Sequence, residues 1–113
     1  MARMKILFVC TFNKMRSKTA EVIFKGDKRF DVKSAGIDEY AEVPLSRELM
    51  DWADYVLVME TFHRRWIRQH YPDLSGDKKL ICLGIPDLYE FMDPALIPLL
   101  QERMEGIFGE PDY

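Results

Sequence analysis

A cysteine and an arginine stand six positions apart near the start of the sequence, within the stretch FVCTFNKMRSKTAE. Cys10 ends an almost unbroken apolar run, Met4 to Cys10, which predicts a strand buried on both faces. Arg16 and Ser17 lead into residues that suit a helix. The loop between them, Thr11 to Met15, would turn its backbone N–H groups and the start of the helix toward an anion the size of phosphate.

These residue types predict phosphoryl transfer to sulfur. The positive end of a helix favours the thiolate form of a cysteine, which is the nucleophilic form. The guanidinium of Arg16 has a fork that can hold two oxygens of a phosphoryl group in transfer, whereas a lysine would act as a point charge. The alternative is that Cys10 is an ordinary core cysteine at the end of its strand. The asparagine, arginine and serine that follow it, Asn13, Arg16 and Ser17, favour the interpretation as a nucleophile.

The pattern Cys-x5-Arg-Ser at a strand end resembles the phosphate loop of the low-molecular-weight protein tyrosine phosphatases. Three further segments, Thr19-Ala20-Glu21, Ser34-Ala35-Gly36 and Val56 to Met59, are similar to segments of that family. The resemblance therefore covers most of the chain. It implies a phosphatase that uses Cys10 as its nucleophile and Arg16 to bind the phosphoryl group.

The resemblance also assigns the supporting residues of the loop. It implies that Asn13 holds the loop in a left-handed turn and that Ser17 donates a hydrogen bond to the thiolate. We expect the phosphate or the substrate to contact the loop and one aromatic residue beyond it, namely Thr11, Phe12, Asn13, Lys14, Met15, Ser17 and Tyr89.

The sequence departs from the family at three places. Lys18 replaces a proline, and Met15 replaces the second cysteine with which many members protect the nucleophile. The stretch between Gly36 and Pro44 is too short for a helix that larger members carry. Cys82 is a weak substitute for the missing cysteine, because it lies in a predicted strand as a small apolar residue would.

Two aspartates compete for the role of general acid, which must protonate the leaving oxygen and then activate water. Asp87 follows Gly84, the end of a predicted strand, by three residues, and Tyr89 comes two positions later. Asp93 precedes Pro94, a pair that commonly begins a helix with the aspartate as its cap. We therefore favour Asp87 as the acid, with Asp93 as the alternative.

Strand and helix patterns alternate along the chain at least four times. Strands are predicted at 4–10, 30–35, 54–59 and 79–84. Helices are predicted at 17–25, at 44–53 and from a cap at Thr61 to about Tyr71. A last helix is predicted from an apolar stripe made of Leu96, Leu100, Met104 and Ile107 or Phe108. Because Pro98 interrupts a helix begun at Pro94, the last helix is expected to start later. The order predicts an α/β fold, a three-layer sandwich with a four-stranded parallel sheet flanked by helices on both faces, in one domain of residues 1–113.

Composition limits the partners and the compartment. The net charge of −3 and the pI near 5.4 disfavour nucleic acid and anionic membrane surfaces. The N-terminal apolar run is too short for a signal peptide and no window could span a bilayer, so we expect a cytoplasmic protein, a monomer or weak dimer. No metal or cofactor is expected. The basic residues His63, Arg64, Arg65, Arg68 and His70 predict the charged outer face of an amphipathic helix rather than a docking surface.

The resulting hypothesis is a phosphomonoester hydrolase, a cysteine-dependent protein tyrosine phosphatase that forms a phosphocysteine on Cys10. Two alternatives stay open at this point. One is an arsenate reductase, which would need an external thiol because Cys82 is the sole other cysteine. The other is a non-catalytic module that binds phosphate or phosphoproteins. Aromatic walls for the substrate are suggested by Phe12, Tyr40 and Tyr89.

Overall fold

Four parallel strands form one sheet in the order β2-β1-β3-β4. The structure is a computed structural model and describes residues 2–76 and 79–111. The strands are β1 (Met4–Cys10), β2 (Phe30–Gly36), β3 (Tyr55–Val58) and β4 (Lys79–Cys82). Because all four run the same way, their carboxyl ends meet at one edge of the sheet, where ligands of such folds bind.

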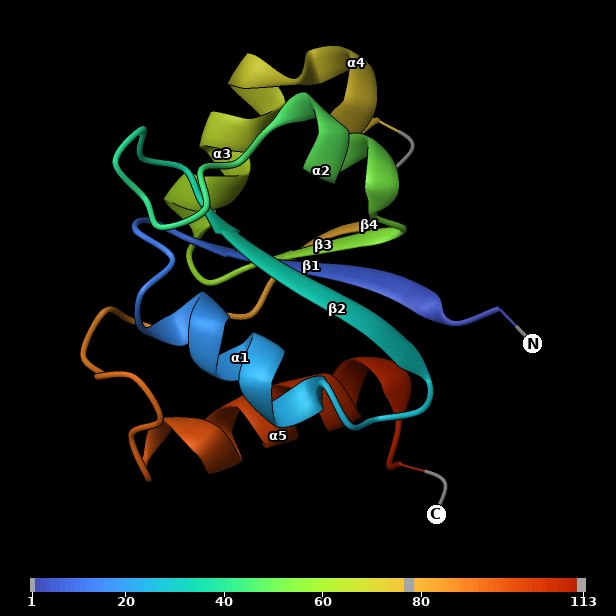
Figure 1. Ribbon diagram of the computed structural model, residues 1–113, viewed down its shortest axis with the longest axis vertical. Coiled ribbons are helices and arrows are strands. Elements are labelled where there is room, and N and C mark those ends of the chain that lie inside the picture. Colours follow the sequence, from blue (N-terminus) through green and yellow to red (C-terminus); the bar gives the residue numbers. More distant parts are fainter. Residues whose placement is uncertain (1, 77–78, 112–113) are drawn as a thin grey trace.

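Helices cover both faces of the sheet, which confirms the predicted three-layer fold. On one face lie α1 (Arg16–Phe24) and α5 (Leu96–Phe108), and on the other lie α2 (Arg47–Trp52), α3 (Thr61–His70) and the short α4 (Pro72–Ser75) (Figure 1). No helix among the described residues is long and apolar enough to cross a bilayer.

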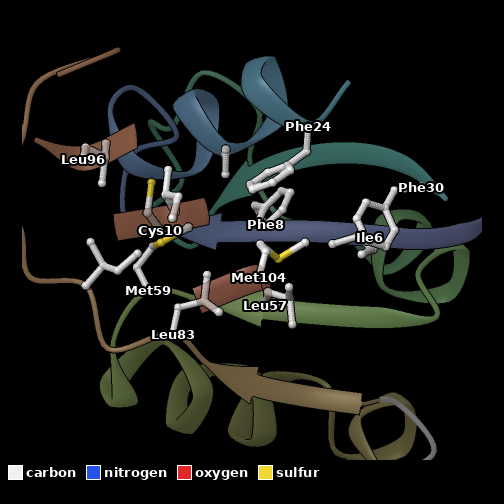
Figure 2. Close-up of a cluster of buried hydrophobic side chains, with 13 residues drawn as sticks. Ile6, Phe8, Cys10, Phe24, Phe30, Leu57, Met59, Leu83, Leu96 and Met104 are labelled. Carbon is white, nitrogen blue, oxygen red and sulfur yellow. The ribbon is translucent and has the colours of Figure 1, made fainter. Parts of the chain in front are cut away.

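The alternation of side chains along β1 divides the core into two clusters. Ile6, Phe8 and Cys10 face α1 and α5, and Figure 2 shows Cys10 at the end of this row. Leu7 and Val9 point to the other face, toward the cluster that includes residues of α2 and α3. All five are buried. Because both faces of β1 are buried, its sequence is an almost continuous apolar run.

The second helix begins later than predicted. The prediction placed its start at Pro44, but Pro44 forms a parallel bridge with Gly36, and the N–H of Leu45 donates to the Gly36 carbonyl. Ser46 is the N-cap, and its hydroxyl accepts from the Leu49 N–H. A proline at a bridge that extends the sheet cannot also start the helix, so α2 begins at Arg47.

The cap of α3 also differs from the prediction. Thr61 is the first helical residue, and Glu60 is the N-cap, in a capping box with His63. At the last helix the prediction is confirmed, since α5 begins at Leu96. Pro98 lies in the first turn of α5, where a backbone N–H has no partner within the helix and its loss is harmless.

Candidate active site

The sulfur of Cys10 lies under the β1–α1 loop (residues 11–15), at the carboxyl end of β1. Its side chain packs against the core cluster shown in Figure 2, and the residue is 3% exposed. Two donors nevertheless reach the sulfur. The backbone N–H of Asn13 donates to Sγ at 3.2 Å, and the Ser17 hydroxyl lies 2.9 Å from it. Hydrogen bonds of this kind stabilise negative charge on sulfur.

The side chain of Asn13 determines which way the Ser17 hydroxyl points. Asn13 adopts a left-handed conformation with φ of 58°, which reverses the loop. Its Nδ2 donates to Ser17 Oγ at 2.9 Å. The hydroxyl proton is then left for Cys10 Sγ at 2.9 Å or for the Ala35 carbonyl at 3.4 Å, and the shorter contact is the stronger one. Asn13 and Ser17 thus lie where the resemblance placed them.

The β2–α2 loop (residues 37–46) supports the β1–α1 loop from outside. N–H groups of Ile37, Asp38 and Glu42 donate to the carbonyls of residues 10, 11 and 12 at 3.0–3.1 Å. Gly36 makes this approach possible, because a Cβ there would lie 2.4 Å from the Thr11 carbonyl oxygen and 2.9 Å from the Asn13 nitrogen. The stretch between Gly36 and Pro44, which is predicted to be too short for a helix, is a loop whose N–H groups bind the carbonyls of the β1–α1 loop.

Arg16 is 2% exposed, and one of its guanidinium nitrogens is fixed in place. Nη1 donates to Glu60 Oε2 at 2.9 Å and to the Ile85 carbonyl at 2.7 Å. Nε and Nη2 have no hydrogen-bond partner among the described residues. Since no fully buried nitrogen or oxygen of a described side chain lacks a partner, these N–H groups keep contact with solvent. A buried guanidinium with two nitrogens that make no hydrogen bond can donate to an anion.

The two aspartates occupy different environments. Asp87 Oδ1 lies 3.8 Å from Arg16 Nη2, and its side chain is 70% exposed. Asp93 Oδ1 accepts from the Ala95 N–H at 2.9 Å, and its carbonyl accepts from the N–H groups of Leu96 and Ile97. The structure therefore places Asp87 next to Arg16, whereas Asp93 accepts hydrogen bonds in the turn that leads into α5, whose N-cap is Ala95.

Two residues of the site, Glu60 and His63, were not predicted. His63 was assigned to the outer face of its helix, and this is wrong, because the residue is fully buried. Its Nδ1 accepts from the Glu60 N–H at 3.0 Å, and its Nε2 lies 2.9 Å from Thr11 Oγ1. Burial, with a smaller effect of the Arg16 charge, lowers the pKa of His63 from 6.5 to about 4. Nε2 therefore carries the proton and donates to Thr11.

A signal for Glu60 was present in the sequence. It follows the buried strand that ends at Met59, and polar residues directly after parallel strands gather at the ligand-binding edge. His63 carried no such signal, since a histidine inside a basic helical stretch is typical of an exposed face. Its burial depends on the packing of α3 against the sheet.

The remaining predicted residues line the outside of the loop or its surroundings. Phe12, Lys14, Met15 and Tyr40 are exposed. Tyr89 is half-buried and packs against the core cluster that contains Cys10. The Met15 side chain provides no cap for α1, so the first N–H groups of that helix are open to an anion. A cavity of about 590 Å³ lies elsewhere, between the end of α1 and α5.

Cys82 is remote from Cys10 in the sheet. It is paired in register with Val58, which is paired with Val9. Its side chain packs in the cluster on the opposite face from Cys10. Among the described residues, no three His, Cys, Asp or Glu side chains are grouped so that they could hold a metal ion.

Comparison with known proteins gives matches at the level of structure. No protein-family model and no curated protein sequence matches the chain. Wzb from Vibrio vulnificus in complex with benzylphosphonate is 24% identical and has a TM-score of 0.73, with 93% of this chain and 97% of that chain covered. YwlE arginine phosphatase from Geobacillus stearothermophilus is 24% identical, with a TM-score of 0.67 and 91% of each chain covered.

A low molecular weight protein tyrosine phosphatase from Bacillus subtilis is 25% identical and has a TM-score of 0.68, with 92% of this chain and 99% of that chain covered. These similarities extend over almost the whole chain. The protein therefore has the fold of the low-molecular-weight protein tyrosine phosphatases, to which it is structurally similar over about 90% of its length.

Proposed function

We propose that this protein is a phosphomonoester hydrolase that forms a phosphocysteine on Cys10 and acts on phosphotyrosine in proteins. The observation that carries the proposal is a buried guanidinium, that of Arg16, whose Nε and Nη2 make no hydrogen bond to a described residue, on the loop and helix start whose Asn13 N–H and Ser17 hydroxyl contact the Cys10 sulfur. Glu60 pairs with the Arg16 charge through Nη1 alone, and the donors that make no hydrogen bond suit the oxygens of a bound oxyanion. The structural similarity to proteins solved with phosphate and benzylphosphonate supports it.

In the proposed first step, the thiolate of Cys10 attacks phosphorus and the P–O bond to the leaving group breaks. Arg16 and the free N–H groups at the start of α1 bind the equatorial oxygens. Ser17 and Asn13 stabilise the thiolate until it attacks. Asp87, as the general acid, gives a proton to the leaving oxygen.

In the second step, the carboxylate of Asp87 takes a proton from water, and that water attacks the phosphocysteine. The S–P bond breaks, inorganic phosphate leaves and Cys10 returns as a thiolate. One of the similar structures is a variant of YwlE arginine phosphatase with a phosphorylated active-site serine, and this supports a covalent intermediate in the proposed mechanism. The exposure of Asp87 suits both proton transfers, because the side chain reaches solvent and lies beside Arg16.

An aromatic leaving group is favoured by the residues around the site. Phe12 in the β1–α1 loop and Leu88 beside Asp87 are both large, apolar and exposed. Such side chains can contact the faces of a phenyl ring. The similarity to an arginine phosphatase makes phosphoarginine the competing substrate. Values of kcat/KM for matched phosphotyrosine and phosphoarginine peptides separate the two.

The test of the mechanism compares two cysteine variants. Cys10→Ser should abolish hydrolysis of p-nitrophenyl phosphate while inorganic phosphate still binds, as measured by calorimetry. Cys82→Ser is the matched control and should keep activity, because Cys82 packs on the other face of the sheet. Wild-type turnover by Cys10→Ser would show that the mechanism is wrong.

Two alternative functions predict other results. A non-catalytic binding module would bind phosphate with no turnover by the wild-type protein between pH 5 and 8. An arsenate reductase would consume an external thiol in the presence of arsenate. An internal relay through Cys82 is disfavoured, since the two sulfurs lie on opposite faces of the sheet.

A further inference from the structure

A basic hollow lies on the exposed side of α3. Its volume is about 300 Å³, and it is lined by Thr61, Arg64, Arg65, Arg68 and Gln69. The residues recur at spacings of three and four, which places them on one side of the helix. Arg65 and Arg68 are exposed and Arg64 is half-buried, so the guanidinium groups are accessible to a partner.

The three arginines of the hollow lack the partners that the other arginines have. Among the described residues, no carboxylate lies within 4.0 Å of Arg64, Arg65 or Arg68. Each of the five arginines elsewhere forms an ion pair, namely Arg3, Arg16, Arg29, Arg47 and Arg103. Among the described residues, the arginines without an ion pair thus all lie in this hollow.

This concentration is not what helix stability favours. Arg64 and Arg68 are four residues apart, a spacing at which like charges destabilise a helix. The chain has 19 acidic residues, yet none lies within α3. A face selected only for solubility would alternate the two signs of charge. The arrangement therefore suits an anionic partner.

The hollow begins next to the candidate active site. Thr61 directly follows Glu60, whose carboxylate binds Arg16. In the same turn, His63 contacts Thr11 of the β1–α1 loop from the buried side of the helix. Figure 1 shows α3 starting at the edge of the sheet where β1 leads into that loop. From Thr61 to Arg68 the helix rises about 10 Å, which three extended residues of a bound chain would cover.

We propose that this hollow binds an acidic segment of a phosphoprotein substrate, next to the phosphorylated residue. Guanidinium groups pair with carboxylates through two parallel hydrogen bonds, which suits aspartate and glutamate side chains. An acidic protein segment is favoured over nucleic acid because the hollow adjoins the phosphate site of the same molecule, and the net charge of −3 opposes a polyanion. The proposal rests on the proposed function and defines its substrate as a protein rather than a small phosphoester.

The test uses two phosphotyrosine peptides, one with a run of glutamates beside the phosphotyrosine and one with glutamines there. Wild-type protein should have a kcat/KM on the order of tenfold higher for the acidic peptide, and the preference should fall as salt rises. The variant R64Q/R65Q/R68Q should lose the preference and keep its turnover of p-nitrophenyl phosphate. The matched control K5Q/K25Q/K28Q removes the same charge from lysines elsewhere on the molecule and should keep the preference.

Binding separates this proposal from the proposed function. Cys10→Ser protein should bind a fluorescent acidic peptide more tightly than the neutral one by anisotropy, and the triple arginine variant should remove the difference. That result supports the hollow even if the wild-type enzyme turns over no phosphoester. Equal kcat/KM values and equal affinities of the wild type for the two peptides would overturn it. The proposal would also be overturned if the triple arginine variant lost affinity for a single-stranded oligonucleotide but kept its affinity for the acidic peptide.

Discussion

At the scale of single residues, the buried His63 joins α3 to the β1–α1 loop. The Glu60 N–H occupies its Nδ1, so the one proton of the neutral ring lies on Nε2 and is donated to Thr11. A second proton would leave the Glu60 N–H without its acceptor and place a positive charge near Arg16. The same contacts that order the loop therefore make His63 a site of acid sensitivity.

The stability of the protein should fall in acid because of His63. Burial lowers its pKa from the ordinary value of 6.5 to about 4 in the folded chain, so between these values the unfolded chain binds more protons. The free energy of unfolding should therefore drop by about 3 kcal/mol as pH falls from 7 to 4, with most of the loss below pH 6.5. Urea unfolding at several pH values measures this. His63→Gln should flatten this part of the dependence, and His70→Gln, an exposed control, should not.

Replacement of the two aspartates should separate their roles. Asp87→Asn should lower kcat for p-nitrophenyl phosphate by about 10²-fold or more, because the leaving oxygen and the attacking water lose their proton carrier. Asp93→Asn should leave kcat within about twofold, since the side-chain oxygen of asparagine can also accept the Ala95 N–H. A steady-state pH profile of both variants checks this. The assignment is wrong if Asp93→Asn is the slower enzyme and still folds.

At the scale of elements, one threonine connects α1 to the β4–α5 loop (residues 83–95). Thr19 is fully buried, and its hydroxyl donates to the Met15 carbonyl at 2.7 Å and accepts from the Met92 N–H at 2.9 Å. Met92 has a positive φ of 59°, which is unfavourable for a side chain of this type. The contact therefore holds the loop that carries Asp87 in a conformation it would not adopt by itself.

Removal of the Thr19 hydroxyl should loosen this loop. Thr19→Val keeps the shape of the side chain but leaves the Met92 N–H without a partner, at a cost of about 1–3 kcal/mol in unfolding free energy. Turnover of an alkyl phosphate should fall more than that of p-nitrophenyl phosphate, because a poor leaving group depends more on the acid. Thr19→Ser should restore both. An unchanged ratio of the two rates in Thr19→Val would refute the positioning role.

Many of the helices and strands were predictable from the sequence, because the residue patterns that define them are local. The limits of β1 and the late start of α5 follow from an apolar run and from Pro98, and the structure agrees. The start of α2 was predicted at Pro44 and is wrong, because Pro44 pairs with Gly36 of β2. The local sequence pattern around the helix does not reveal this pairing. The cap of α3 was missed because glutamate is a less common cap than threonine.

At the scale of the whole molecule, the sheet separates the two cysteines. Cys10 packs with the residues under α1 and α5, whereas Cys82 packs with the cluster on the other face. A disulfide requires Cα atoms within about 7 Å and side chains that point toward each other. The register places β1 and β4 on either side of β3, so this geometry does not exist.

Oxidation should therefore not link Cys10 to Cys82. After treatment with hydrogen peroxide without added thiol, Cys10 should appear as sulfinic or sulfonic acid, since no partner sulfur intercepts the sulfenic acid. Peptide mapping under non-reducing conditions measures the products. Added glutathione should convert Cys10 to a mixed disulfide that dithiothreitol reverses. A Cys10–Cys82 peptide in monomeric protein would contradict this geometry.

The sequence by itself determined the strand, the loop and the helix that bring Cys10, Asn13, Arg16 and Ser17 together, because all four lie within eight residues of one another. It also determined the fold class, through the alternation of strand and helix patterns. Only the tertiary structure brought Glu60, His63 and the Ile85 carbonyl to that loop. The physical reason is the strand order β2-β1-β3-β4, which places the ends of β1 and β3 side by side and is not encoded in any local periodicity.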